Sequence, residues 1–289
     1  MRNVSPERPC WCGSGQPYQQ CHQTIERRAA ELQQQGYWIP NRRLIKTAAQ
    51  LEGIRRSGRL TTEILDKVGA LVEPGVSTAA IDTFVHQYTL AHGAYPAPLH
   101  YKGFPKSVCT SLNQVICHGI PRPDEVLREG DIINIDVTTI LDGFYADASR
   151  MYLVGKVSPA AAKLVRVARE CLRVGVDQVK PFASLNAIGN AIEPLARLHG
   201  YAVVRELGGH GTGVAFHEPL HVDHFVKAGK GYLLLPGMVF TVEPMINAGG
   251  PECRTLNDNW TVVTQDGSLS AQWEQTVAVT GDGVEILAG

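Results

Sequence analysis

The chain has 289 residues, a formal net charge of −1 at pH 7, and 44% apolar residues, which is enough to bury a sizeable core. The near-neutral charge excludes a strongly cationic protein, so we expect no specific nucleic-acid partner. No apolar run approaches the ~20 residues of a membrane-spanning helix, and the first residues lack the apolar stretch of a secretory signal. We therefore expect a cytoplasmic protein that has no membrane partner.

The N-terminal residues contain a compact set of metal-binding side chains. The seven cysteines are an odd number, and three of them lie close together, which favours one metal site over a disulfide framework. Three thiolates and one imidazole suit a tetrahedral structural zinc ion, with the ligands Cys10, Cys12, Cys21 and His22. This segment resembles the SEC-C zinc-binding motif, so we assign residues 1–23 to such a module. The alternative is a disordered tail that happens to contain cysteines.

A helix is expected directly after this module. Residues 24–35 are rich in helix formers, and Gly36 follows as a residue that can end a helix. We interpret residues 24–43 as a helical linker and residues 44–289 as the main domain. A partner such as the ribosome or another protein would then bind through the zinc module.

The main domain repeats a sequence pattern at an offset of 107 residues. The pattern Val-x-Pro-x-x-Ser-x-x-Ala-Ile occurs at residues 72–81 and again at residues 179–188. Each copy predicts a turn, a serine N-cap and an amphipathic helix. The same offset makes Asp136 equivalent to Glu243, each at the end of an apolar strand. We predict two related halves that each present a carboxylate at their seam, in an α+β fold with antiparallel strand pairs.

A β-hairpin in the first half predicts the first pair of metal ligands. The Asp142-Gly143 dipeptide is a favoured two-residue turn between strands with alternating apolar residues. In the register that this turn sets, Asp136 lies opposite Ser149, and Asp147 lies on the same face as Asp136, roughly 7–8 Å away at the backbone. Two carboxylates that are this close repel each other unless they share a cation.

Three residues of the second half extend this pair. His210 stands in a glycine-rich loop, Glu243 ends its strand before a proline, and Glu274 lies in an alternating strand. An unpaired carboxylate is excluded from the buried face of such a strand. Four carboxylates and one imidazole suit two divalent ions such as cobalt, manganese, iron(II) or zinc, with the ligands Asp136, Asp147, His210, Glu243 and Glu274.

The segments that carry these ligands resemble the type I methionine aminopeptidases at residues 134–138, 145–150, 209–211, 241–245 and 271–274. The resemblance runs from about residue 44 to the C-terminus and implies the pita-bread (creatinase/aminopeptidase) fold of two pseudo-symmetric halves. It also implies that Asp147 and Glu274 bridge both ions. Asp136 would complete one ion, and His210 with Glu243 would complete the other.

The same resemblance implies a reaction and a substrate. A di-metal-activated water would hydrolyse the first peptide bond, removing the initiator methionine co-translationally from nascent chains with a small second residue. His118 would contact the scissile amide, His217 would stabilise the oxyanion, and Glu243 would shuttle protons. The methionine side chain would enter an apolar slot lined by Tyr101, Phe104, Cys109, Phe216 and Trp260.

The sequence departs from the family pattern at three positions, Pro98, Pro219 and Gln275, none of which removes a ligand. We expect His221 and His224 on the surface or behind the ligands. Two other functions stay open. A prolidase or Xaa-Pro aminopeptidase has the same fold and the same ligand types. A non-catalytic relative would bind partners through a cleft without metals.

Overall fold

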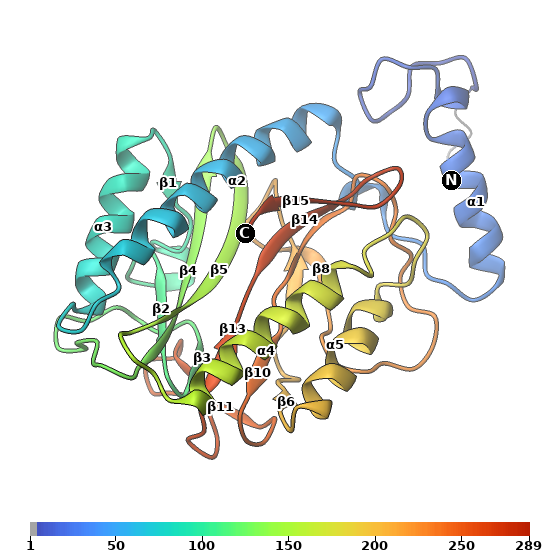
Figure 1. Cartoon of the computed structure of the whole chain (residues 1–289). Helices are drawn as coiled ribbons and strands as arrows, with labels where there is room; N and C mark the ends of the chain where they lie inside the picture. The colour runs from blue at the N-terminus through green and yellow to red at the C-terminus, as the bar shows by residue number, and fades with distance from the viewer. Residues whose placement is uncertain (1–4) are drawn as a thin grey trace.

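The computed structural model describes residues 5–289, and Figure 1 shows two α/β halves side by side with an N-terminal segment at one edge. The first half contains helices α2 and α3 and five strands. Their bounds are α2 Ala48–Val68, α3 Thr78–Ala91, β1 Tyr95–Pro96, β2 Cys109–Leu112, β3 Val115–Cys117, β4 Ile132–Leu141 and β5 Phe144–Leu153. In this half β4 pairs with β1, β2 and β5, and α2 packs across β5.

The second half repeats this plan with helices α4 and α5. Its elements are α4 Pro159–Val176, α5 Asn186–Leu198, β6 Ala202–Val203, β7 Gly209–Gly211, β8 Glu218–Val222, β9 Val239–Val242, β10 Met245–Asn247, β11 Cys253–Thr255, β12 Val262–Thr264, β13 Ser270–Gln272, β14 Gln275–Val279 and β15 Val284–Ala288. A five-stranded sheet has the order β15-β14-β9-β7-β8. The pairings between the named strands of residues 5–289 are antiparallel, which confirms the predicted α+β class.

The predicted duplication is present in the backbone hydrogen bonds. The N–H of Thr78 donates to the carbonyl of Glu125, and 107 residues later the N–H of Leu185 donates to the carbonyl of Tyr232. The glycines that open the two equivalent strands, Gly130 and Gly237, both have a left-handed backbone, with φ values of 96° and 89°. These features recur at the predicted offset of 107 residues, which supports two related halves.

The helix starts are less symmetric than the sequence predicts. The Ser77 hydroxyl caps α3 by accepting the N–H of Ala80. Helix α5, in contrast, has Leu185 as its N-cap. The hydroxyl of the equivalent serine, Ser184, donates to the carbonyl of Lys230 and accepts the N–H of Asn186. Ser184 therefore lies one residue before the N-cap, contrary to the prediction, although its hydroxyl still accepts the N–H of the first residue of α5.

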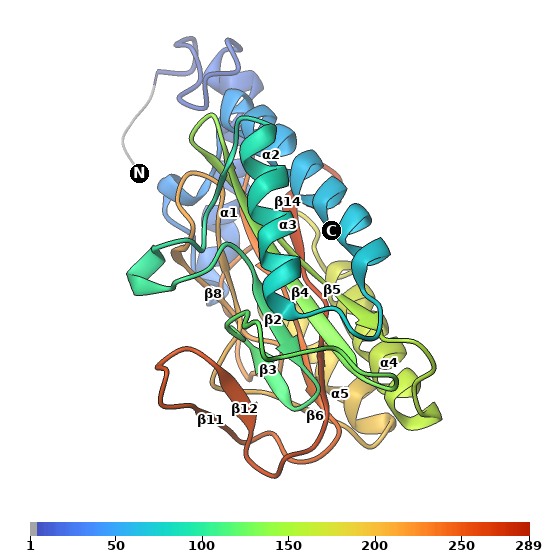
Figure 2. The same ribbon diagram turned by 90° about the vertical axis from the view of Figure 1, so that its left-hand side faces the viewer.

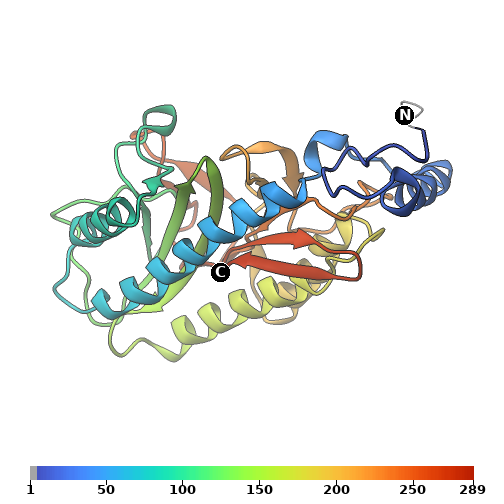
Figure 3. The same cartoon turned by 90° about the horizontal axis from the view of Figure 1, so that it is seen from above.

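The helices of both halves lie on one face of the strands (Figures 2 and 3). The short helix Tyr101–Gly103 and the β11–β12 hairpin lie on the opposite side in Figure 2. Residues of both halves line one shared cavity. Within residues 5–289, none of the helices is both long and apolar enough to cross a membrane.

The N-terminal segment packs against the second half. Helix α1, Gln23–Gln34, lies within one residue of the predicted helix, and its Ala29 and Leu32 side chains join the core cluster that includes α4. The carboxylate of Glu26 accepts hydrogen bonds from Trp11, Tyr18 and Arg42. These contacts connect the cysteine-containing loop, α1 and the segment that leads into α2.

Candidate metal and substrate site

The β4–β5 hairpin presents its two aspartates as predicted. Asp136 pairs with Ser149 and Asp147 with Thr138, which is the register that the two-residue turn sets. The Thr138 hydroxyl donates to Oδ1 of Asp147 at 2.7 Å and fixes that carboxylate. Both carboxylates therefore enter the cavity from the first half of the molecule.

The second half contributes three residues, two of which lie in different local structures from those predicted. His210 is on strand β7 rather than in a loop, because Gly209 allows β7 to lie directly against β9. A Cβ atom at Gly209 would be 2.3 Å from the carbonyl oxygen of Thr241. Glu274 lies between β13 and β14 rather than inside one strand, and it forms an isolated bridge with Ser149. Glu243 directly follows β9, as predicted.

All five predicted ligands line one cavity of about 350 Å³. Asp147, His210 and Glu274 can each offer one ligand atom such that these atoms lie within 4.8 Å of one another. Nε2 of His210 is 3.7 Å from Oδ2 of Asp147 and 3.7 Å from Oε1 of Glu243. Asp136 and Glu243 border the same cavity outside this trio. The five side chains thus come together from four separate segments.

The electrostatics of this cluster fit divalent cations. Asp147 and Glu274 are only 4% and 2% exposed. Burial and then the neighbouring carboxylates raise the pKa of Asp136 and Glu274 well above their usual values. Burial also raises the pKa of Asp147, and it raises the pKa of Glu243 to about 8. Ionising these groups together is unfavourable without a counter-charge, and oxygen-rich ligands with one imidazole suit divalent metals.

The pKa values of two histidines at the rim of the cluster are lowered. Burial lowers the pKa of His118 to about 4 and that of His217 to about 3, and the nearby His210 lowers both further. The ring of His217 lies 4.0 Å from that of His210 and stacks on Tyr101 at 5.3 Å between centroids. At neutral pH each imidazole can therefore donate one N–H to a substrate without carrying charge.

Part of the cavity lining is apolar, and there Phe104 and Trp260 meet edge to face with their centroids 5.2 Å apart. All five residues predicted for the methionine slot line it, namely Tyr101, Phe104, Cys109, Phe216 and Trp260. Of the three departures from the family pattern, Pro98 also lines the cavity. Pro219 is exposed on β8, and Gln275 lines a different groove, so only Pro98 can affect the slot directly.

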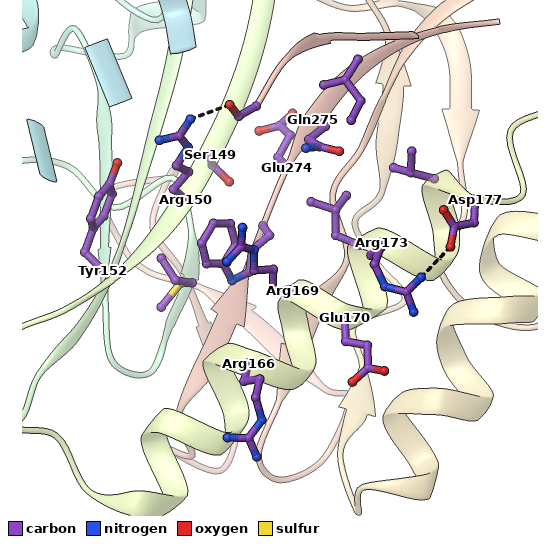
Figure 4. A pocket seen from close by; sticks show the side chains of 16 residues that line it. Ser149, Arg150, Tyr152, Arg166, Arg169, Glu170, Arg173, Asp177, Glu274 and Gln275 are labelled. Carbon is purple, nitrogen blue, oxygen red and sulfur yellow. Dashed lines mark hydrogen bonds and ion pairs between the residues drawn. The ribbon is translucent and has the colours of Figure 1, made fainter. Parts of the chain in front are cut away.

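That groove is larger, about 870 Å³, and Figure 4 shows it between α4 and β5. It is bordered by four arginines, Arg150, Arg166, Arg169 and Arg173. Arg150 pairs with Asp66, and Arg173 pairs with Asp177, so half of this positive charge is neutralised locally. Among the five predicted ligands only Glu274 touches the groove. Its lining lacks the cluster of acidic groups that a metal site needs.

No sequence pattern predicts the hydrogen bonds that hold Glu243 in place. His224 is 1% exposed, and its Nε2 accepts the main-chain N–H of Glu243 at 3.1 Å. Thr241 donates to Oε1 of Glu243 at 2.6 Å, and Gln272 donates to Oε2 at 3.2 Å. His221, in contrast, is largely exposed at the cavity rim beside Asp223. The sequence did not distinguish His221 from His224, whereas the structure places His221 at the exposed rim and buries His224.

The four predicted zinc ligands also lie together. Nδ1 of His22 is 3.2 Å from Sγ of both Cys10 and Cys21, and Sγ of Cys12 is 3.5 Å from Sγ of Cys21. The three cysteines are free of disulfides. Burial lowers the pKa of His22 and so favours the neutral imidazole that binds metal. Three sulfurs and one nitrogen in this arrangement could hold one metal ion.

Two family models match the chain, one over each of its two parts. Residues 52–281 match the family model "Metallopeptidase family M24", and residues 9–24 match "SEC-C motif". The chain is 52% identical to methionine aminopeptidase A of Synechocystis sp. over 82% of its own length and 94% of that protein. It is 47% identical to methionine aminopeptidase of Escherichia coli (strain K12) over 84% and 92% of the two lengths. The crystal structure of methionine aminopeptidase from Rickettsia prowazekii has a TM-score of 0.83 at 47% identity, covering 85% of this chain and 99% of that one.

Proposed function

The chain belongs to metallopeptidase family M24 and is a methionine aminopeptidase, and from this premise we propose that two divalent ions are held by Asp136, Asp147, His210, Glu243 and Glu274. In this proposal Asp147 and Glu274 would each contact both ions. Asp136 belongs to one ion, and His210 with Glu243 belongs to the other. The identity of the ions is left among cobalt, manganese, iron(II) and zinc, since this ligand set accepts all four.

When bound, the two ions supply an activated water and a positive anchor for the free α-amine of the substrate. The protein side chains contribute the remaining steps. The neutral imidazole of His118 donates to the scissile amide, and that of His217 donates to the developing oxyanion. This donation needs no change in protonation at neutral pH, because both pKa values lie near 4 or below.

Glu243 is the proposed proton carrier. Thr241 and Gln272 donate to its two carboxylate oxygens and hold it in one orientation. Without metal, burial raises the pKa of Glu243 to about 8, and in the proposed reaction its carboxylate would take a proton and return it to the leaving amine. The bound cations would lower that pKa, so the value in the working enzyme lies below the metal-free one.

The apolar slot gives the specificity. Phe104, Trp260, Phe216 and Cys109 line the cavity, and in this proposal they would surround the unbranched thioether of the substrate. We propose that the second substrate residue is small, and that the enzyme removes the initiator methionine from nascent chains in the cytoplasm as they are made. The SEC-C segment, with Cys10, Cys12, Cys21 and His22 around one structural zinc, is the proposed contact to the ribosome or another protein.

One observation supports the proposal most: five metal-ligand side chains border the same cavity as the apolar slot. The test is a comparison of Met-Ala-Ser, Met-Leu-Ser and Ala-Pro-Ala as substrates for the metal-reconstituted enzyme. We expect methionine release from the first and much less from the second. Cleavage of the proline peptide alone would assign a prolidase instead. If none of the three peptides is cleaved, the result would indicate a non-catalytic binding protein.

A further inference from the structure

We infer that Lys46 is a positioning residue for the loop that carries Phe216 and His217. The inference rests on the proposed role of His217 at the oxyanion. Lys46 lies outside the cavity and touches none of the predicted ligands, so it acts through the protein rather than on the substrate. Its partner is Glu218, the first residue of β8, which lies 172 positions away in the sequence.

The contact between these residues is a buried ion pair. Nζ of Lys46 is 2.5 Å from Oε2 of Glu218, and the two side chains are only 1% and 6% exposed. Most ion pairs of residues 5–289 involve far more exposed side chains, which water and salt screen. A buried pair behaves differently, because removing one partner leaves an uncompensated charge in the interior. The geometry of Glu218 therefore depends on the presence of Lys46.

Glu218 in turn closes the loop. Its Oε1 accepts the main-chain N–H of Val214 at 3.0 Å, while its backbone pairs with Gly211 at the end of β7. The Glu218 carboxylate lies at the end of the β7–β8 loop and bonds to Val214 near the beginning of that loop. Phe216 and His217 lie between these two attachment points. Movement of the carboxylate would break its hydrogen bond to Val214.

Lys46 itself is held firmly. Its main-chain N–H donates to the carbonyl of Gly237 at 2.8 Å, and the next residue, Thr47, forms a capping box that starts α2. The loop approaches the lysine closely at Gly213, where a Cβ atom would be 3.2 Å from Cε of Lys46 and φ is +121°. The ammonium group is therefore fixed between the start of α2 and the loop.

The position of the loop matters because it sets where the exposed His217 side chain stands. Its ring lies 4.0 Å from the ring of His210, one of the predicted ligands, and it contacts Tyr101 on the other side. An oxyanion donor is effective only within hydrogen-bond distance of the transition state, and a displacement of about 1 Å can cost about 100-fold in rate. Loosening the Lys46–Glu218 pair should then lower kcat.

The test compares Lys46→Met with the matched control Arg55→Met. Arg55 also connects α2 to a distant strand, through an ion pair of 2.6 Å with Glu285, but it lies away from the cavity. We expect Lys46→Met to lower kcat on Met-Ala-Ser by about 10- to 100-fold with little change in KM. Hydrogen exchange of residues 212–218 in the metal-free protein should also become faster. Arg55→Met should change neither quantity.

A double-mutant cycle with His217→Ala separates this inference from the proposed function. If Lys46 acts through His217, Lys46→Met will lower kcat no further when His217 is already alanine. The inference is overturned if the two substitutions lower kcat by independent factors, or if Lys46→Met leaves the hydrogen exchange of residues 212–218 unchanged. An unaffected kcat in His217→Ala alone would instead overturn the role of His217. If Lys46→Met fails to fold, Lys46→Met/Glu218→Gln removes both charges and is measured in its place.

Discussion

The imidazole of His224 accepts the main-chain N–H of Glu243 in a buried hydrogen bond of 3.1 Å. This contact fixes the backbone at the point where β9 ends and the predicted ligand begins. Because the accepting nitrogen must be unprotonated, it also requires a neutral His224, and burial lowers the pKa of that histidine to about 3. A residue outside the metal cluster thus determines where one ligand stands.

Replacing His224 with leucine should weaken the site. The substitution leaves the N–H of Glu243 buried without a partner, which costs about 1–3 kcal/mol of folding stability. We also expect metal affinity to fall by about 10- to 100-fold, as for other residues that support a metal ligand. Urea unfolding and a metal titration measure the two effects. His224→Gln keeps an acceptor and should lose less of both, and equal losses in the two variants would contradict this role.

The metal-free protein should lose stability as the pH rises. The folded pKa of Glu243, about 8, is above its unfolded value of about 4.5, so the folded state binds the proton more tightly. The folding stability that protonated Glu243 contributes is fully present below about pH 4.5 and is lost as the pH rises through about 8. Urea unfolding with a chelator at several pH values measures this loss. Glu243→Gln cannot ionise and should be more stable than wild type near pH 8; an identical pH dependence would contradict the prediction.

The two metal sites should be separable. Cys10→Ser/Cys12→Ser removes two thiolates from the N-terminal cluster, so the protein should contain one zinc ion fewer. Turnover of Met-Ala-Ser should be unchanged, because the catalytic cavity contains none of these residues. Elemental analysis and a peptide assay give both quantities. Cys253→Ser, which alters a free cysteine elsewhere, is the control and should keep all the zinc.

The close approach of β7 to β9 should tolerate no side chain at Gly209. In Gly209→Ala the new Cβ would be 2.3 Å from the Thr241 carbonyl oxygen, and this backbone atom cannot move without separating the strands. We expect a loss of thermal stability and weaker metal binding, since His210 is the next residue. Gly281→Ala, where a Cβ meets no atom within 4 Å, should leave the melting temperature unchanged. Equal melting temperatures for the two variants would contradict the argument.

Local chemistry predicted much of this structure. The β4–β5 register followed from the Asp142-Gly143 turn, because a two-residue turn sets every cross-strand pair. The equivalence of Asp136 and Glu243 followed from the duplication. The position of Glu274 could not be predicted in this way, because the break between β13 and β14 depends on the pairing of Glu274 with Ser149 in the other half.

Contacts between distant segments were beyond prediction for the same reason. His224 and Glu243 meet only after β8 and β9 have folded into one sheet, and a buried histidine that accepts an N–H has no sequence signature. Lys46 and Glu218 are likewise separated by most of the chain. Periodicity and turn chemistry report neighbours within an element, whereas the supports of a site come from the tertiary fold.

The most direct test of the proposed function is methionine release from Met-Ala-Ser as manganese is added back to chelator-treated enzyme, for wild type and for His210→Ala. We expect the wild-type protein to be inactive without metal and to regain activity with it, and His210→Ala to stay inactive at the same manganese concentration. Equal activity of the metal-free and reconstituted proteins, or a fully active His210→Ala, would contradict this expectation.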